Sequence, residues 1–249
     1  MARQSGLIKI KGTLDNVTFY KSKDGHLARM KTSVDATRIA NDPAFIRTRE
    51  NGSEFGNSAA AGKYLRDTVR TMMLTASDSR VTSRITKLMT DIKNLDTTSV
   101  RGERNVGVAI AQPAAKQMLD SLDFNINAIL SSILYAPFTI DTATGIISFA
   151  ALTPINDIAF PTGATHITLS CAFANIDFAT GISNIQFSNV VSLPIDGTTA
   201  PQTLTPVAVP TGTGTQIYLL EIQFFQQVNS VLYSLKNGAY NALKIVDVV

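Results

Sequence analysis

The sequence predicts an α+β fold in which an N-terminal β-hairpin or meander and a helical hairpin are followed by an antiparallel β-sandwich. Three observations support this class: apolar and polar residues alternate near the N-terminus, apolar residues then recur with helical spacing, and short apolar runs separated by turn residues fill the second half. We therefore divide the chain into an N-terminal arm (1–40), a helical segment (41–123) and a β-sandwich domain (124–249).

The N-terminal arm contains the alternating stretch GLIKIKGTLDNVTFYKSKDGHLARMK, residues 6–31. Asp24-Gly25 between two such runs is a strong hairpin signal, and the stretch as a whole predicts three short strands. Because so few strands bury little apolar area, we expect this sheet to pack against the rest of the chain or against a neighbouring molecule. The arm residues that we assign to such an assembly interface are Ile8, Ile10, Phe19 and Tyr20.

The helical segment begins at Asp42-Pro43, where the aspartate suits an N-cap and the proline suits the first helical position. The spacing of apolar residues predicts a first helix from Ala44 to about Leu74. It predicts a second helix in SRVTSRITKLMTDIKNL (79–95), forming a hairpin with the first, and a short third helix in 111–122.

The stretch GSEFGNSAAAGKYLR (52–66) resembles a phosphate-binding loop but does not satisfy its spacing. Five residues separate Gly56 from Gly62 where four are required, and Tyr64 stands where a magnesium-binding hydroxyl belongs. We therefore interpret the small residues as a helix surface that another backbone can approach closely. Gly52, Gly56 and Gly62 join the predicted assembly interface.

The second half of the chain contains seven or eight short apolar runs separated by turn residues, which is typical of an antiparallel β-sandwich. The predicted strands are 126–135, 145–152, 164–174, 183–193, 202–210, 215–225, 230–235 and 242–249. The pattern D-x-A-T-G-I occurs at Asp141–Ile146 and again at Asp177–Ile182. We interpret both copies as turns with glycine in the left-handed conformation, since one carboxylate per loop is too few for calcium.

Charge is divided unequally between the two halves of the chain. Residues 1–123 carry 20 Lys and Arg against 13 Asp and Glu, a net charge of +7, whereas residues 124–249 carry 2 against 6, a net charge of −4. No Lys or Arg occurs between Lys116 and Lys236. Ordinary soluble surfaces mix both signs, and interfaces between proteins are depleted of charge, so this composition favours a protein contact surface over a merely neutral exterior.

The sequence contains no catalytic motif of the H-E-x-x-H, C-x-x-C, G-x-S-x-G or G-x-G-x-x-G type. We predict neither catalytic activity nor a cofactor or metal, because the only histidines are His26 and His166 and the single cysteine, Cys171, lies in an apolar strand. Glu221 is in the middle of the run YLLEIQFF, and we expect it at an edge strand or an interface, with a lone catalytic carboxylate as the alternative.

The basic first half is a candidate surface for a polyanion. Residues 1–94 hold 17 Lys and Arg against 9 Asp and Glu, and phosphate binding requires such an excess but no particular motif. The residues that we assign to this contact, all on the first predicted helix, are Arg47, Arg49, Lys63, Arg66 and Arg70. The charge is diffuse and interleaved with acidic residues, so nucleic acid ranks below self-association as a partner.

The first residues, MARQSGLIKIKG, show no apolar signal segment, and no apolar run reaches 18 residues. We therefore expect synthesis in the cytoplasm and no membrane span. The final location is left open, with an assembled particle and the cell exterior both compatible with the sequence.

The stretch from Gly6 to Arg29 and the closing run YLLEIQFFQQVNSVLYSLKNG resemble an uncharacterised protein family common in Bacteroidota. Gly12, Tyr20, Gly25 and Arg29 carry the match, which covers the two ends of the chain. The resemblance implies an N-terminal hairpin, a helical segment and a C-terminal β-sandwich, and it implies no activity.

These observations favour a structural, self-assembling subunit of a filament, sheath, virion-like shell or surface layer. Two alternatives stay open: a non-catalytic module that binds a protein or a glycan, and a nucleic-acid-associated protein that uses the basic half. A small-molecule substrate is not expected.

Overall fold

The computed structural model describes residues 2–30 and 34–249, and it divides into two compact units, Met1–Asn51 and Gly52–Val249. The fold is α+β with antiparallel sheets. The predicted boundary at residue 123 lies inside the second unit, where helices and sheet share one hydrophobic core.

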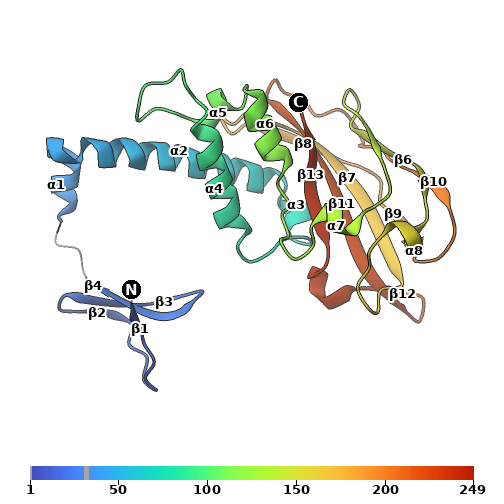
Figure 1. Cartoon of the computed structure of the whole chain (residues 1–249), viewed down its shortest axis with the longest axis horizontal. Coiled ribbons are helices and arrows are strands. Elements are labelled where there is room, and N and C mark those ends of the chain that lie inside the picture. The colour runs from blue at the N-terminus through green and yellow to red at the C-terminus, as the bar shows by residue number, and fades with distance from the viewer. Residues whose placement is uncertain (1, 31–33) are drawn as a thin grey trace. The chain divides into compact units, whose positions relative to one another are not determined.

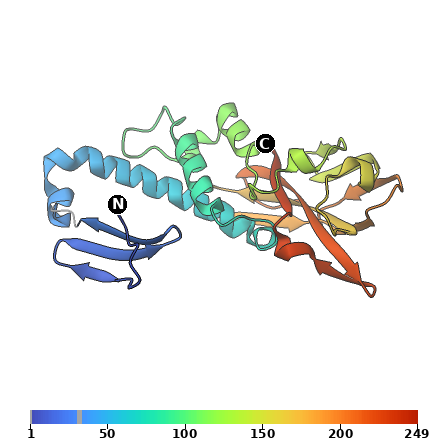
Figure 2. The same cartoon turned by 60° about the horizontal axis from the view of Figure 1, so that its bottom comes forward.

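The first unit contains an antiparallel sheet, drawn in dark blue in Figure 2. Its strands lie in the order β1-β4-β3-β2. Its strands are β1 (Ala2–Arg3), β2 (Gly12–Leu14), β3 (Val17–Ser22) and β4 (Gly25–Met30). The alternating residues 8–11, which supplied the first of the three predicted strands, form a loop, so that strand is wrong. The sheet is completed instead by β2, where a turn was expected, and by β1, which pairs with β4 and is followed by a hydrogen bond of 2.9 Å from the Gln4 amide to the His26 carbonyl. The hairpin turn at Asp24-Gly25 is confirmed, with Gly25 at φ +109°.

The remainder of the first unit is helical. It consists of α1 (Ala36–Asn41), the 3-10 helix η1 (Pro43–Phe45) and the start of α2 (Ile46–Thr68). The predicted cap is confirmed, since Asp42 Oδ1 accepts a hydrogen bond from the Ala44 amide at 2.9 Å and Pro43 occupies the first position of η1.

The second unit has three layers: helices, a six-stranded sheet and a three-stranded sheet (Figure 1). Helices cover one face of the larger sheet, and they are α2, α3 (Arg70–Met73), α4 (Val81–Lys93), α5 (Val106–Ala109) and α6 (Pro113–Asp120). The predicted first helix is interrupted at the buried Val69, whose φ of −94° and ψ of 15° depart from helical values.

The six-stranded sheet is built on two long central strands, β7 (His166–Ile176) and β11 (Thr215–Val228). The outer edge of β11 pairs with both β12 (Val231–Ser234) and β13 (Ala242–Val248), and the outer edge of β7 pairs with both β8 (Ser183–Phe187) and β9 (Val191–Pro194). The predicted strand 183–193 is therefore two strands, and Ser188 between them accepts a hydrogen bond from the Cys171 amide.

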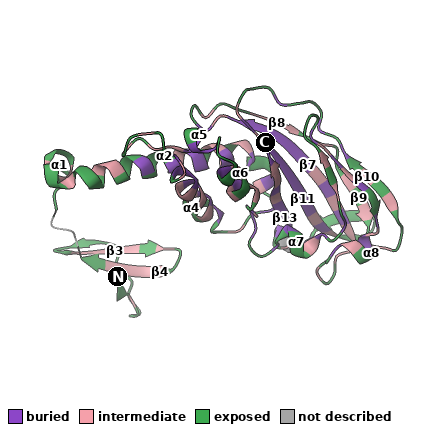
Figure 3. Ribbon diagram, turned by 45° about the horizontal axis from the view of Figure 1, so that its top comes forward, coloured by how far each residue is buried: buried purple, intermediate pink, exposed green. Residues whose placement is uncertain are grey.

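Both faces of the central strands are buried (Figure 3), which explains their nearly continuous apolar sequences. Ile217 and Leu219 of β11 face the helices, whereas Leu220 and Ile222 face the smaller sheet. That sheet has the order β10-β6-β5 and consists of β5 (Thr139–Asp141), β6 (Ile146–Leu152) and β10 (Ala200–Leu204). Its apolar face closes the second core of the unit.

The predicted strand at 126–135 is wrong. This segment forms the short helix α7 (Leu130–Ile133), and only Leu134 makes a bridge, to Ile158 just after α8 (Pro154–Asp157). Asp123 explains the difference, because its Oδ1 accepts a hydrogen bond from the Leu130 amide at 2.9 Å and so starts a turn. The chain ends with the 3-10 helix η2 (Leu235–Gly238) and β13.

The two D-x-A-T-G-I segments fold in the same way, which confirms the prediction of turns. In each segment the aspartate accepts from the amide two residues ahead, at 3.0 Å for Ala143 and 2.8 Å for Ala179. It also accepts from the threonine hydroxyl three residues ahead. The glycines, Gly145 and Gly181, adopt φ +77° and +79°.

Replacing Gly181 with alanine is expected to destabilise the second unit by roughly 1–3 kcal/mol, because of its positive φ and because a Cβ there would lie 2.6 Å from Cε1 of Tyr64. Urea denaturation followed by circular dichroism measures the change. The matched control is Gly197→Ala, since no described atom lies within 4 Å of a Cβ at Gly197. Equal stability of the two variants would contradict the packing of this turn against α2.

Candidate functional site

The sheet of the first unit has two chemically different faces. Strand register places Leu14 opposite Val17, Val17 opposite Met30, and Phe19 opposite Ala28. Because side chains alternate along a strand and paired residues share a face, these five residues lie on one side of the sheet, and we call them the apolar face. The next pair on this side, Lys21 and His26, is polar and borders the apolar face at the Asp24-Gly25 end of the hairpin. The opposite side carries the intervening residues Thr13, Thr18, Tyr20, Leu27 and Arg29.

The apolar face is open. Leu14 is 68% exposed and Met30 is 70% exposed, while Val17, Phe19 and Ala28 are half-buried. None of the described residues from Ala2 to Met30 is buried, and Figure 3 colours this sheet pink and green throughout. Antiparallel sheets with one apolar face usually pack that face against other protein surface. This face is therefore a candidate contact surface.

The four arm residues predicted for an assembly interface do not share one surface. Phe19 lies on the apolar face, whereas Tyr20 lies on the opposite face with the Arg29 guanidinium 5.7 Å from its ring centroid. Ile8 and Ile10 belong to the loop between β1 and β2 and are 85% and 48% exposed. Leu14, Val17 and Met30 were not among the predicted interface residues. Alternation counted outward from the Asp24-Gly25 turn identifies Val17 and Met30, whereas Leu14 lies beyond a second turn, at Asp15-Asn16.

The three predicted interface glycines differ in their surroundings. Among the described residues, no heavy atom lies within 4 Å of a Cβ built at Gly52 or Gly56, and both glycines are exposed. Gly62 is buried, and a Cβ there would lie 3.2 Å from Cγ2 of Ile85 and 3.6 Å from Cγ of Met89. Gly62 therefore serves the contact between α2 and α4 within the chain.

The five residues assigned to polyanion contact are spread over both units. In the first unit, Arg47 lies 4.0 Å from Glu50, and Arg49 donates to the carbonyls of Ile39 and Asp42. These contacts hold the beginning of α2 against the preceding turn.

The three assigned cations of the second unit differ in their surroundings. Lys63 lies 4.0 Å from Asp67, and Arg66 is half-buried beside Gly62. Arg70 is exposed at the start of α3. Lys63 and Arg70 are thus exposed, and the polyanion contact stays a prediction.

A buried ion cluster fixes α2 to α4 and to the loop that follows α4. Glu54, 2% exposed, accepts from Lys93 Nζ at 2.7 Å, from two nitrogens of Arg104 at 2.8 Å, and from the Gly102 amide at 2.8 Å. The Arg104 guanidinium, together with Lys93, lowers the pKa of Glu54 to about 2. This residue lies within the glycine-rich stretch that resembles a phosphate-binding loop, and sequence spacing carried no signal of its distant partners.

The loop after α4 is organised by Asp96, which is 3% exposed. Its carboxylate accepts from the amides of Thr98, Ser99 and Asn105, and these hydrogen bonds keep its pKa below the usual range although burial alone would raise it. Every oxygen of this buried carboxylate thus has a structural partner.

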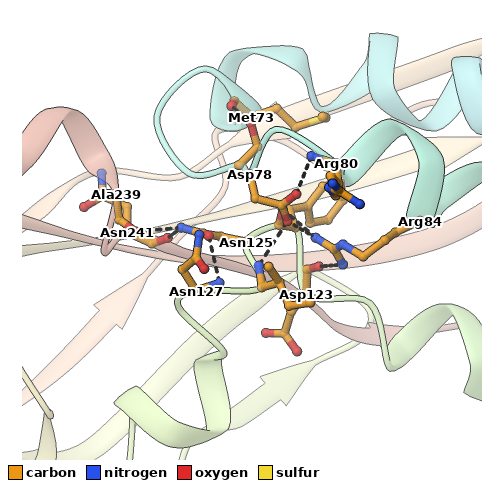
Figure 4. Close-up of polar contacts among 12 residues, drawn as sticks. Met73, Asp78, Arg80, Arg84, Asp123, Asn125, Asn127, Ala239 and Asn241 are labelled. Atoms are coloured by element: carbon orange, nitrogen blue, oxygen red, sulfur yellow. Dashed lines mark hydrogen bonds and ion pairs between the residues drawn. The ribbon is translucent and has the colours of Figure 1, made fainter. Parts of the chain in front are cut away.

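A second polar cluster joins the helices to the chain segment before α7 (Figure 4). Asp78 pairs with Arg84 and accepts from the Ile126 amide at 3.1 Å, while Arg84 donates to the carbonyls of Asp123 and Phe124 at 2.7 and 3.0 Å. These contacts close the helical layer over the six-stranded sheet.

Glu221 lies on the central strand β11, so the prediction of an edge or interface position is wrong. It is 3% exposed on the face covered by helices, between Ser170 of β7 and Leu243 of β13. Its Oε1 lies 2.5 Å from the Thr75 hydroxyl, and the Ser170 hydroxyl donates to its Oε2 at 3.2 Å. Burial raises the pKa of Glu221.

Thr75 links Glu221 to the helical layer. Its Oγ1 also lies 2.8 Å from the Met72 carbonyl, which accepts from the amides of Thr75 and Ala76 at 3.1 Å as well. The carboxyl group of Glu221 is therefore buried among hydrogen-bonding groups of β7 and of the turn after α3.

Cavities of the second unit lack converging reactive groups among the described residues. One of about 320 Å³ lies between α5, α6 and the ends of β7 and β11. It contains Lys116 and Asp177, but the Asp177 carboxylate already accepts from Ala179 and Thr180. The groove beside Phe55 and α4, about 520 Å³, is lined by one serine and three threonines of α4 and by Lys87 and Asp91, which form an ion pair with each other at 3.1 Å.

Other signatures of a site are missing from the described part of the chain. It contains no group of three or more His, Cys, Asp or Glu side chains suited to hold a metal ion. Cys171 is buried and burial raises the pKa of its thiol to about 11, so it is an unreactive thiol. No helix among residues 2–30 and 34–249 is long and apolar enough to cross a bilayer.

Comparison of the chain with protein-family models, with curated proteins and with solved structures finds no match. The resemblance to a Bacteroidota family therefore stays a prediction, and the function has to be argued from the chain itself.

Replacing Glu54 with glutamine is expected to lower the free energy of unfolding at pH 7 by roughly 3–5 kcal/mol, because Lys93 is left buried without its counter-charge. A carboxylate with a lowered pKa stabilises the fold above the unfolded pKa of 4.5, and this contribution is lost as the pH falls toward 2. The difference between the two proteins, measured by urea denaturation, should therefore shrink from pH 5 to pH 2. The control is Glu103→Gln in the exposed part of the same loop, and an equal loss in both variants would contradict the assignment.

Replacing Glu221 with glutamine is expected to raise the free energy of unfolding at pH 8 and to leave it nearly unchanged at pH 4. A raised pKa means that the stabilisation is complete below the unfolded pKa of 4.5 and is lost as the pH rises through the folded pKa. Between those two pKa values the free energy of unfolding falls by about 1.4 kcal/mol for each step of one in pH. Glutamine keeps the shape and the hydrogen bonds without that loss. A variant that is less stable than the parent at pH 8 would mean that the folded protein holds a charged carboxylate there.

Proposed function

We propose that this protein is a structural subunit that assembles with copies of itself into a large homo-oligomer, of the kind that forms a filament, sheath, shell or surface layer. The observation that carries the proposal is the apolar face of the N-terminal sheet. Leu14, Val17, Phe19, Ala28 and Met30 are aligned by strand register, and none of them is buried.

The composition of the second half supports the same function. The absence of Lys and Arg from residues 117–235 leaves a surface of Thr, Ser, Asn and scattered apolar side chains. Such a surface loses little hydration energy when another protein covers it, whereas Lys and Glu would have to be desolvated.

The use that the fold makes of its charged residues also supports a structural role. Glu54, Asp96 and Glu221 are the buried carboxylates of the described chain, and each of them is hydrogen-bonded to groups that hold the layers together. A general acid or base would need access to a substrate, which these three carboxylates do not have.

Light scattering coupled to size-exclusion chromatography tests the proposal directly. We expect a mass of many times 26.7 kDa that persists in 1 M NaCl and after nuclease treatment, since contact through apolar surfaces does not weaken with salt. A monomer of 26.7 kDa under all conditions would overturn the proposal and favour a binding module. A high ratio of absorbance at 260 to 280 nm, with a mass that falls after nuclease or salt, would instead favour a nucleic-acid-associated protein.

A further inference from the structure

The N-terminal sheet offers a face rather than an edge for docking. Its two edge strands, β1 and β2, contain two and three residues, so each presents few backbone groups to an added strand. The apolar face, in contrast, extends across β2, β3 and β4. Strand addition, as in β-augmentation, is therefore a weaker use of this sheet than packing by its face.

The area of the apolar face indicates a contact that has to be repeated. The face extends over β2, with three residues, and over β3 and β4, with six residues each. At about 3.3 Å per residue and about 4.8 Å between strands, it covers roughly 240 Å². A stable protein contact buries about 800 Å² on each partner, so this face alone is less than about a third of one. Each subunit can dock its own apolar face on one neighbour and receive the apolar face of another neighbour. It then makes the contact twice, which favours an assembly of many copies over an isolated pair.

Charge selects among the surfaces that two copies can bring together. Residues 2–30 hold six Lys or Arg against two Asp, a net charge of +4, so two of these sheets repel each other. Residues 124–249 have a net charge of −4. The sheet of one copy is thus matched in sign to the β-rich part of another copy and not to itself.

The β-rich part has an exposed apolar surface at the interrupted edge of its larger sheet. We call this surface the edge patch, and it consists of Phe187, Val190, Val207 and Val209, which are 36%, 66%, 84% and 50% exposed. A hydrogen bond of 3.0 Å from the Val207 amide to the Phe187 carbonyl joins its two segments, as does a bridge between Ser188 and Pro206. Asp196 is the only charged residue between positions 183 and 220.

We infer that the apolar face of the N-terminal sheet docks on the edge patch of a second copy of this chain, so that subunits join head to tail. This inference rests on the proposed function and specifies its contact. The two surfaces differ, so the contact is heterologous, and repetition of a heterologous contact produces closed rings or open filaments.

Pairwise disulfide trapping tests the inference on the full-length protein. Cys171 is buried, so a cysteine introduced at the surface is the reactive thiol. Leu14→Cys and Val207→Cys proteins carrying different affinity tags are coexpressed and oxidised, and the product is examined by non-reducing electrophoresis. We expect a disulfide-linked dimer that contains both tags, at roughly tenfold or more the yield obtained with Thr18→Cys in place of Leu14→Cys, since Thr18 lies on the opposite face.

Three outcomes would overturn the inference. They are equal yields from Leu14→Cys and Thr18→Cys, dimers that link two Leu14→Cys chains, and a Leu14→Cys/Val207→Cys double variant that closes a disulfide only within one chain. Light scattering of the unmodified protein distinguishes failure of this inference from failure of the proposed function. A large particle without the Leu14–Val207 link would keep the assembly and reject this contact, whereas a monomer would reject both.

Discussion

The larger sheet needs cover on both of its faces, and most of the second unit depends on that requirement. β7 and β11 are apolar on either side, with Ile217 and Leu219 toward the helices and Leu220 and Ile222 toward the smaller sheet. Burial of an aliphatic side chain contributes about 1.5–3 kcal/mol, so both covers are strongly favoured. The helices provide the first cover and β5, β6 and β10 provide the second.

The buried polar residues keep the helical cover in place. Glu54 ties α2 to α4 and to the loop beyond it, and Arg84 ties α4 to the segment that leads into the second core. Glu221 ties β11 to the helical layer through its hydrogen bond with Thr75, which follows α3. Each of these groups is expensive to bury alone and is satisfied only when the layers are assembled, so the polar contacts fix how the layers sit more than they add to stability.

The sequence predicted the elements whose signals are local and missed those whose partners are distant. β7, β11, β13 and α4 follow from runs and periodicities within each segment. The two D-x-A-T-G-I turns follow from their own aspartate and glycine. The same local signal was misleading at 126–135, where an apolar run forms α7 because Asp123 caps the Leu130 amide.

The polar sites were the least predictable part of the molecule. The cluster of Glu54 with Lys93 and Arg104 joins residues 39 and 50 positions apart, and no spacing rule connects them. Glu221 was misplaced because a charge in an apolar run normally marks an edge, whereas in this central strand its carboxyl group is hydrogen-bonded to Thr75 and Ser170, which are distant in the sequence. The part of the apolar face on β3 and β4 was within reach of sequence reasoning, because it needs only the hairpin turn and a period of two.

The two units differ in how much of their apolar surface is buried by their own residues. This difference is the physical argument for the proposed assembly. The second unit buries its central strands on both faces and pairs its buried charges. The sheet of the first unit has a specified register and one apolar face, yet none of its described residues is buried. Packing against one face of a sheet maintains the pairing register of its strands. A slip of one residue would move the apolar side chains of a strand to the opposite face and so lose that packing. This specified register supports our proposal that the sheet is covered in an assembly, and its positive charge, opposite in sign to the net charge of residues 124–249, supports another copy of the same chain as the proposed partner.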